Sequence, residues 1–344
     1  MSMTHDLEQT MKKLSTRGKG ILAADESSAT IGKRFAAVGV ESTEETRRTY
    51  RDMLITTPGI SEFIAGVILF EETLNQNALD GTPFPEKLMK LGIVPGIKVD
   101  KGLTILPNTA EEQITQGLDG LAERLAEYKK KGACFAKWRG VYRISANTPS
   151  PLAIDANAEC LARYAALCQA AGIVPIVEPE VLIDGDHTIE RCAEVSEPVL
   201  RAVFDALQRH HVQLEYVILK PSMVISGKTC STKASVERVA SATMAALRRQ
   251  VPAAVPTINF LSGGQSPEDA TAHLNAMNAM SAHSPWNISY SYARALQDDA
   301  MKIWHGDNKN IPAAQKAFYR RAKFNSLAAV GKYNPAMEKE TSIA

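Results

Sequence analysis

The chain has 344 residues, of which 45% are hydrophobic and 22% are charged, and its formal net charge is +1. That composition supports a sizeable core and argues against a nucleic-acid-binding surface or an acidic disordered tail. The chain shows no apolar signal region, no apolar run near the ~20 residues that span a bilayer and no Cys-x-x-Cys pair, which predicts a cytoplasmic protein that binds neither membranes nor nucleic acid and keeps its thiols reduced.

Short apolar runs rich in β-formers alternate with longer segments of helical periodicity along the chain. The runs predict eight strands: Gly20–Ala24, Gly66–Phe70, Gly96–Val99, Cys134–Lys137, Ile173–Val177, Tyr216–Leu219, Thr257–Leu261 and Asn287–Tyr290. The periodic segments predict helices over Thr43–Leu54, Thr115–Lys130, Asp155–Ala171, Val195–His210, Val236–Arg249, Ala270–Met280 and Ile311–Ala328.

Strands that alternate with helices in this way are typical of parallel βαβ units, and about eight such units close a (β/α)8 TIM barrel. The alternative, a doubly wound open sheet, would need a glycine-rich cofactor loop at its switch point. No Gly-x-Gly-x-x-Gly follows the first predicted strand. We therefore predict an α/β fold with a single barrel domain over residues 1–330, followed by a polar, mobile C-terminal tail over residues 331–344.

Ionisable residues gather where the predicted strands end. Barrel interiors are normally filled with apolar side chains, and barrel enzymes keep their sites at the C-terminal ends of the strands. A solvated loop position is the alternative for any one of these residues, but their number predicts an active site. The residues are Asp25, Lys98, Lys137, Arg139, Glu178, Glu180, Lys220 and Arg294.

Lys220 is the strongest candidate for a nucleophile. It follows an apolar strand and precedes Pro221, which favours an extended backbone. Burial disfavours an ammonium ion, and the cations Lys137 and Lys98 would add like-charge repulsion. A neutral lysine attacks a ketone, and the iminium ion that results can accept the electrons of a breaking carbon–carbon bond.

Proton transfer in such a reaction needs nearby acids and bases. Asp25, Glu178 and Glu180 lie at neighbouring strand ends and are carboxylates of the kind that can move protons. No spacing of histidines, cysteines or carboxylates resembles a metal site, and Gly227-Lys228-Thr229 lacks the first glycine of a P-loop because Ser222 stands there. We expect neither a metal ion nor a cofactor.

Two groups of residues predict anion sites. The segment from Leu261 to Ser266 contains Ser262, Gly263 and Gly264 and opens a helix, so its backbone amides favour a phosphate, although a plain turn is the alternative. Ser291 and Arg294 would join it from the last strand. A second basic, hydroxyl-bearing rim contains Ser27, Thr30, Lys33, Arg34, Lys98 and Arg139. Two anion sites that flank a lysine imply a substrate with two phosphates.

The chain resembles the class I fructose-bisphosphate aldolase family in motifs from about Gly18 to Tyr333. They are Gly20-Ile-Leu-Ala-Ala-Asp-Glu-Ser, Gly66-Val-Ile-Leu-Phe, Gly96-Ile-Lys-Val-Asp-Lys-Gly, Phe135-Ala-Lys-Trp-Arg, Gly172-Ile-Val-Pro-Ile-Val-Glu-Pro-Glu, Leu219-Lys-Pro, Phe260-Leu-Ser-Gly-Gly-Gln-Ser and Ser291-Tyr-Ala-Arg-Ala-Leu.

The resemblance implies reversible cleavage of fructose 1,6-bisphosphate to dihydroxyacetone phosphate and glyceraldehyde 3-phosphate, in glycolysis and gluconeogenesis. It implies that Lys220 forms the Schiff base, that Glu178 is the acid and base of carbinolamine dehydration, and that Asp25 takes the proton of the C4 hydroxyl. Lys137 and Glu180 would support the site electrostatically. It also implies a homotetramer that acts on sugar phosphates.

The resemblance further divides the anion sites between the two phosphates. The C1 phosphate would bind Ser262, Gly263, Gly264, Ser291 and Arg294, and the C6 phosphate would bind Ser27, Thr30, Arg34, Lys98 and Arg139.

Two positions depart from the family pattern. Ala293 stands where the family usually has glycine, so a positive φ there would be strained. The chain ends in Ala344 rather than in the tyrosine that commonly reaches the family's active site. Two further functions stay open at this point. One is a transaldolase-like Schiff-base barrel for a monophosphate, and the other is a non-catalytic sugar-phosphate-binding scaffold.

Overall fold

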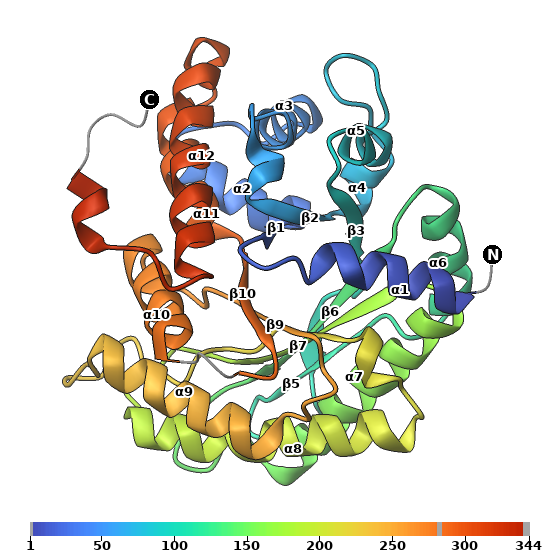
Figure 1. The fold of residues 1–344 in the computed structure, drawn as a ribbon. Helices are drawn as coiled ribbons and strands as arrows, with labels where there is room; N and C mark the ends of the chain where they lie inside the picture. The colour runs from blue at the N-terminus through green and yellow to red at the C-terminus, as the bar shows by residue number, and fades with distance from the viewer. Residues whose placement is uncertain (1–2, 281–283, 340–344) are drawn as a thin grey trace.

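A computed structural model describes residues 3–280 and 284–339, which form a closed barrel of parallel strands wrapped by helices (Figure 1). Neighbouring strands around the barrel follow the order β1-β10-β9-β8-β7-β6-β3-β2. The barrel strands are β1 (Gly20–Ala24), β2 (Ile64–Leu69), β3 (Val94–Lys98), β6 (Phe135–Tyr142), β7 (Val174–Val181), β8 (Ile218–Leu219), β9 (Thr257–Phe260) and β10 (Asn287–Tyr292).

The predicted (β/α)8 barrel is confirmed, and every predicted strand overlaps a barrel strand. The helices are α1 (Met3–Leu14), α2 (Ser28–Ala36), α3 (Glu44–Ile55), α4 (Glu71–Leu74), α5 (Phe84–Lys90), α6 (Leu121–Lys130), α7 (Pro151–Ala170), α8 (Ile189–Arg209), α9 (Val236–Gln250), α10 (Pro267–Met280), α11 (Arg294–Trp304) and α12 (Ile311–Ala328). Short 3-10 turns cover Ile60–Glu62, Leu214–Tyr216, Asn308–Asn310 and Pro335–Lys339.

The prediction of one helix over Thr115–Lys130 is wrong at its start. Gln113–Thr115 forms strand β5, which pairs antiparallel with β4 (Leu103–Ile105) outside the barrel. The helix begins only at Leu121, because Gly120 has a φ of 64°, which a right-handed helix does not contain.

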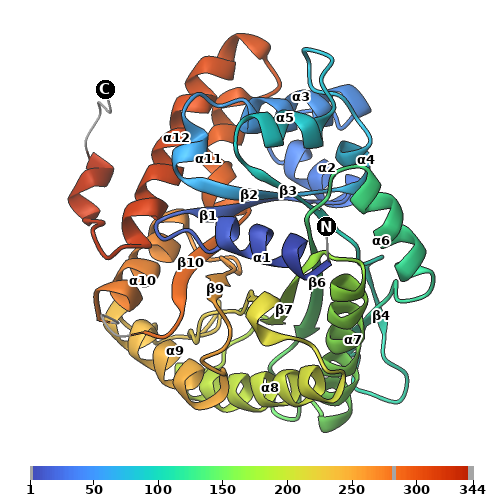
Figure 2. The same cartoon turned by 45° about the vertical axis from the view of Figure 1, so that its right-hand side comes forward.

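One end of the barrel is filled by apolar side chains and covered by α1, which lies across it in Figures 1 and 2. The ring of Phe135 lies over Gly96 of the neighbouring strand, where an added Cβ would come within 2.3 Å of it. Leu7, Met11 and Leu14 of α1 pack into the same cluster. The spacing of these three residues along the sequence is typical of a helix. Helix α1 was nevertheless not among the predicted helices, because it precedes the first strand.

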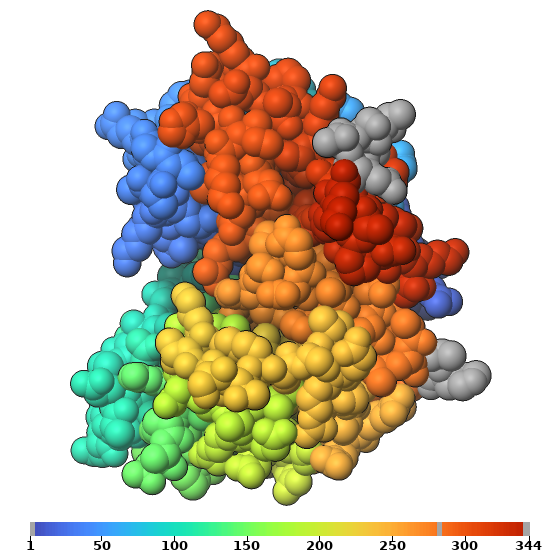
Figure 3. Space-filling view, turned by 90° about the vertical axis from the view of Figure 1, so that its left-hand side faces the viewer, coloured from blue at the N-terminus to red at the C-terminus, as the bar shows by residue number. Residues whose placement is uncertain are grey.

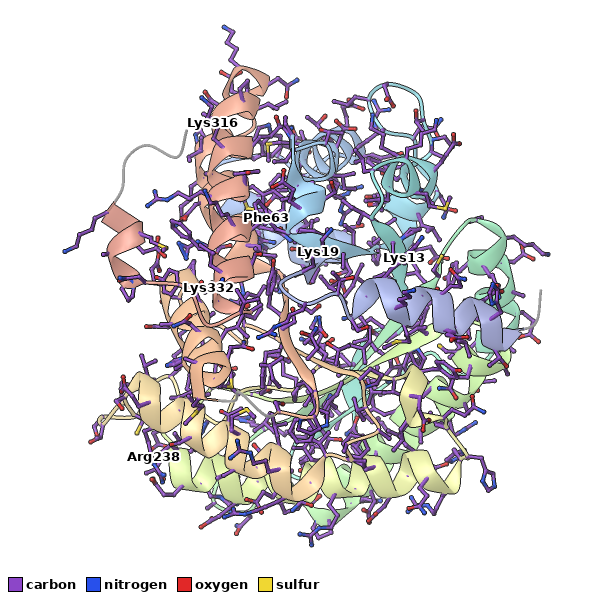
Figure 4. All side chains as sticks on the ribbon, viewed as in Figure 1. Lys13, Lys19, Phe63, Arg238, Lys316 and Lys332 are labelled. Atoms are coloured by element: carbon purple, nitrogen blue, oxygen red, sulfur yellow. The ribbon has the colours of Figure 1, made fainter. Side chains whose placement is uncertain are left out.

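This covered end is the N-terminal end of the strands. Lys19 and Phe63, labelled in Figure 4, mark the points where β1 and β2 enter the barrel, and the amide of Gly20 donates to the carbonyl of Phe63 at 2.9 Å. The C-terminal ends of the strands, where the predicted site residues lie, are therefore at the opposite end of the barrel.

The last described segment, residues 331–339, lies on the surface of α10 and α12 (Figure 3). Arg321 of α12 binds the carboxylate of Glu338 at 2.5 Å, and the hydroxyl of Tyr333 donates to the same carboxylate at 2.9 Å. The remainder of the predicted tail, including Ala344, lies outside the described residues. Within the described ranges, no helix combines the length and apolar character needed to cross a membrane.

Candidate active site

A cavity of about 510 Å³ opens at the C-terminal ends of the barrel strands. Its size falls in the usual range of ~300–1,000 Å³ for small-molecule sites. Every site residue predicted from the sequence lines it except Gly264, which lies one residue beyond the lining Gly263. Lys33 of the second basic rim lines it too. Residues that were not predicted as site residues also line it: Ala23, Glu26, Asp100, Gly102, Leu103, Leu261 and Ala293.

Strand periodicity explains how neighbouring strands deliver these side chains. Lys137 and Arg139 lie two residues apart on β6, and Glu178 and Glu180 lie two residues apart on β7. The side chains of each pair therefore point to the same side of their strand. All four line the cavity, which identifies that side as the barrel interior. Ladder register then places Arg139 opposite Glu178.

Lys220 lines the cavity directly after β8. Its backbone amide donates to the carbonyl of Val177 at 2.8 Å, which continues the β7–β8 ladder by one residue. Its Nζ lies 3.3 Å from Oε1 of Glu178, and only 5% of its side chain is exposed. The predicted nucleophile is therefore buried and within reach of a carboxylate.

Lys137 contributes a buried cation to this centre. Its Nζ lies 2.8 Å from Oδ2 of Asp25 and 3.2 Å from Oε2 of Glu178. Burial alone would lower the pKa of Lys137, but Asp25 and Glu178 raise it well above its ordinary value. Lys137 therefore stays an ammonium ion, which makes it a source of fixed positive charge beside Lys220.

The carboxylate of Asp25 is held ionised. Burial would raise its pKa, but the charges of Lys137, Lys220 and Lys98 outweigh burial and lower the pKa to about 2. By contrast, burial raises the pKa of Glu180 above its ordinary value despite the charge of Arg139. Two carboxyl groups in one cavity thus have pKa values displaced in opposite directions, which is a common feature of acid–base sites.

We call the C1-phosphate candidates the open rim: Ser262, Gly263, Gly264, Ser291 and Arg294. Gly263 and Gly264 have φ angles of 55° and 85°, a left-handed backbone that glycine adopts without strain. The hydroxyl of Ser291 is buried and has no hydrogen-bond partner among the described residues. Arg294 begins α11 and lines the cavity, and no described carboxylate pairs with it within 4.0 Å. These features suit an anion from outside the chain.

The positive φ that would be strained at Ala293 does not occur. This residue has φ −103° where the chain turns from β10 into α11, and its backbone amide remains. The departure from the family glycine therefore leaves the open rim intact.

We call the C6-phosphate candidates the paired rim: Ser27, Thr30, Arg34, Lys98 and Arg139. The three cations of this rim each contact carboxylates of the chain. Arg34 pairs with Glu26 and Asp298, Lys98 Nζ lies 2.7 Å from Asp100 Oδ1, and Arg139 Nη1 lies 2.9 Å from Glu180 Oε2. Ser27 caps α2 by accepting from the amide of Thr30 at 3.3 Å.

The comparisons with known proteins agree with this geometry. Residues 6–344 match the family model described as class I fructose-bisphosphate aldolase. A non-muscle-type aldolase of Lethenteron camtschaticum is 55% identical over 96% of this chain and 91% of its own, and a probable class 1 aldolase of Xanthomonas campestris is 54% identical over 95% of this chain and 98% of its own. The chain belongs to the class I fructose-bisphosphate aldolase family.

A solved structure agrees as well. The fructose-bisphosphate aldolase of Plasmodium falciparum, crystallised in complex with TRAP and a small-molecule inhibitor, superposes with a TM-score of 0.95 at 50% identity, covering 96% of both chains. Class I aldolases are metal-independent lyases of glycolysis, and that activity is assigned to this chain. The transaldolase-like and scaffold alternatives are set aside by the same matches.

Proposed function

We propose that Lys220 is the Schiff-base nucleophile for fructose 1,6-bisphosphate, with the other predicted residues in the roles that the family resemblance implies. The observation that carries the proposal is the position of Lys220: buried, 3.3 Å from Glu178, and in one cavity with residues of both rims, each of which offers a cation and hydroxyls. A ketose bisphosphate laid across the cavity would place its middle carbons over Lys220.

The first half of the reaction forms the iminium ion. The neutral amine of Lys220 adds to the C2 carbonyl, and a proton moves from nitrogen to oxygen to give a carbinolamine. Glu178 donates a proton to the C2 hydroxyl, which leaves as water, so that C2 becomes doubly bonded to a positively charged nitrogen. Lys137, 3.2 Å from Glu178, stabilises the carboxylate that remains.

The second half breaks the C3–C4 bond. The carboxylate of Asp25 accepts the proton of the C4 hydroxyl, C4 becomes the aldehyde carbon of glyceraldehyde 3-phosphate, and the bonding electrons form an enamine with the Lys220 nitrogen. Protonation of the enamine at C3 and hydrolysis of the iminium release dihydroxyacetone phosphate and regenerate the amine. Water or a carboxyl group of the cavity would supply the enamine proton.

Family membership also supports a cytoplasmic homotetramer with one barrel domain and a short tail. Relatives named cytosolic aldolases, such as one from Arabidopsis thaliana at 55% identity, support the location. Sedimentation or mass photometry tests the tetramer directly.

Reductive trapping tests the proposed nucleophile. Borohydride added with dihydroxyacetone phosphate reduces the iminium ion to a stable secondary amine, and peptide mapping should place it on Lys220. Lys220→Met should abolish trapping without changing the thermal unfolding midpoint by more than a few degrees, about what a ~1 kcal/mol change produces. Lys33→Met, which removes another lysine that lines the cavity, should leave trapping in place. A label on Lys137 would overturn the assignment.

A further inference from the structure

A glutamine outside the cavity connects three elements that carry the paired rim. Gln297 lies on α11 and is fully buried. Its amide nitrogen donates to the carbonyl of Ala23 at 2.6 Å, and its amide oxygen accepts from Arg34 Nη1 at 2.9 Å and from the hydroxyl of Tyr50 at 3.1 Å. One amide thereby joins β1, α2 and α3, and every contact it makes is with the chain itself.

The contact with Ala23 arises from the way β10 ends. The β1–β10 ladder pairs Ile21 with Ser291 and Leu22 with Tyr292, and it stops there because the chain turns into α11 at Ala293. Ala23 still pairs with β2 on its other side, but toward β10 its carbonyl has no strand amide to accept from. The Gln297 amide supplies that missing donor, so the side chain is fixed by the barrel wall.

The contact with Arg34 completes a set of oxygen acceptors around one guanidinium. Glu26 and Asp298 supply carboxylates to Arg34, and Gln297 supplies a neutral oxygen between them. A neutral acceptor orients a guanidinium without adding negative charge, whereas a third carboxylate would repel an incoming phosphate. Arg34 can therefore be held rigidly and still leave the paired rim attractive to an anion.

We infer that Gln297 is a positioning residue that aims Arg34 at the second phosphate and so sets the preference for bisphosphate over monophosphate ketoses. The inference rests on the proposed function, which places the C6 phosphate at the paired rim. The open rim should not depend on this side chain, because the start of α11 is held by its own backbone. The amides of Leu296 and Gln297 donate to the carbonyl of Ala293 at 3.0 and 3.1 Å.

The test compares two substrates in the variant Gln297→Met, which keeps the length of the side chain and removes its hydrogen bonds. The KM for fructose 1,6-bisphosphate should rise roughly tenfold, the low end of what one hydrogen bond to a charged group contributes. The KM for fructose 1-phosphate should change less than about twofold, because the open rim is untouched. Similar rises for both substrates, or none for the bisphosphate, would overturn the inference.

Gln315→Met is the matched control. Gln315 also donates its amide to a backbone carbonyl, that of Met53 at 3.0 Å, and it makes no hydrogen bond to Arg34. Gln315→Met should lower the free energy of unfolding about as much as Gln297→Met does, and it should leave both KM values unchanged. A selective rise in the bisphosphate KM of Gln315→Met would show that loss of any such hydrogen bond produces the effect, and would contradict the role of Gln297.

A second variant keeps the test decisive if Gln297→Met does not fold. Gln297→Glu retains the shape and an acceptor for Arg34 but adds a negative charge, so its bisphosphate KM should exceed that of wild type. The variant-to-wild-type ratio should fall toward one as the pH is lowered, because a protonated carboxyl donates and accepts as an amide does. A ratio that does not change with pH would overturn the inference.

Failure of the inference can be distinguished from failure of the proposed function. If Arg34→Ala leaves the bisphosphate KM unchanged, the second phosphate does not bind at the paired rim, and the proposed function is at fault. If Arg34→Ala raises that KM and Gln297→Met does not, the rim assignment stands and the positioning role of Gln297 is wrong.

Discussion

Residues of the open rim and of the paired rim line the cavity that holds Lys220, but their cations are held in different ways. Arg294 of the open rim meets no carboxylate among the described residues, and Ser291 offers a buried hydroxyl without a partner. On the paired rim, Arg34 is bound to Glu26 and Asp298. The open rim is therefore built for a ligand that comes from outside, whereas the paired rim is also part of the framework that holds the barrel and its helices together.

The largest expected effect is on stability, and it should separate the two rims. Arg34→Ala leaves the buried carboxylate of Glu26 without its cation, and it should lower the free energy of unfolding by about 3 kcal/mol, the low end for a broken buried pair because Asp298 is one-third exposed. Arg294→Ala should change the unfolding free energy by less than about 0.5 kcal/mol, as a substitution without ion-pair partners does. Urea titrations of both variants measure this, and equal losses would contradict the distinction.

The second effect is on substrate binding at the open rim. Arg294→Ala should raise the KM for fructose 1,6-bisphosphate more than about tenfold, since a charge-assisted hydrogen bond contributes roughly 1.5–3 kcal/mol. Arg294→Lys should recover only part of this, because lysine lacks the bidentate geometry of the guanidinium. An unphosphorylated ketose should be affected far less, and equal losses for both substrates would place Arg294 outside the phosphate site.

A third, smaller effect concerns the backbone of the open rim. Gly264 has a φ of 85°, and an added Cβ would lie 3.4 Å from Arg294 Nη2, so Gly264→Ala should strain the loop and displace the arginine. The strain of a left-handed alanine, ~1–2 kcal/mol, should lower the free energy of unfolding, and the displaced arginine should raise the KM for the bisphosphate severalfold.

Gly81 offers the control for that backbone effect. Its φ is 86°, and nothing lies within 4 Å of an added Cβ. Gly81→Ala should lower stability to a similar extent and leave KM unchanged. A loss of substrate affinity in both variants would indicate a general effect of lower stability.

The smallest effect is expected at Ser291. Because its hydroxyl has no partner in the chain, Ser291→Ala should leave stability unchanged or slightly higher, while the KM for the bisphosphate should rise about threefold to tenfold, the value of one ordinary hydrogen bond. Thermal unfolding and steady-state kinetics on the same preparation check both parts. A marked drop in stability would show that the hydroxyl serves the fold.

The sequence predicted the barrel and the residues of the cavity because both follow from local patterns. Strand-end residues such as Lys220 and Glu178 can be recognised from an apolar run and the charge that follows it. The partners of the rims could not be recognised in this way, because they are set by tertiary packing. Gln297 follows the motif that ends in Leu296, yet its role depends on where β10 leaves the ladder, and no one-dimensional pattern encodes that point.

Other differences have simpler causes. The β4–β5 hairpin was missed because short strands of three residues carry little alternation, and the segment from Thr115 reads as helical until Gly120 is seen to have a positive φ. The position of Glu338 beneath Tyr333 was also not predictable, because it depends on a carboxylate reaching Arg321 across two segments of the chain.

Phe135 and α1 close the N-terminal end of the barrel. Sugar phosphate therefore enters and leaves at the C-terminal end of the barrel. The water lost and regained at C2 and the enamine proton use the same opening. A substrate bound in that opening limits the access of water to Lys220. The rates of the proton-transfer steps therefore depend on the bound sugar as well as on the protein. A solvent isotope effect on turnover that differs between the bisphosphate and fructose 1-phosphate would show this dependence.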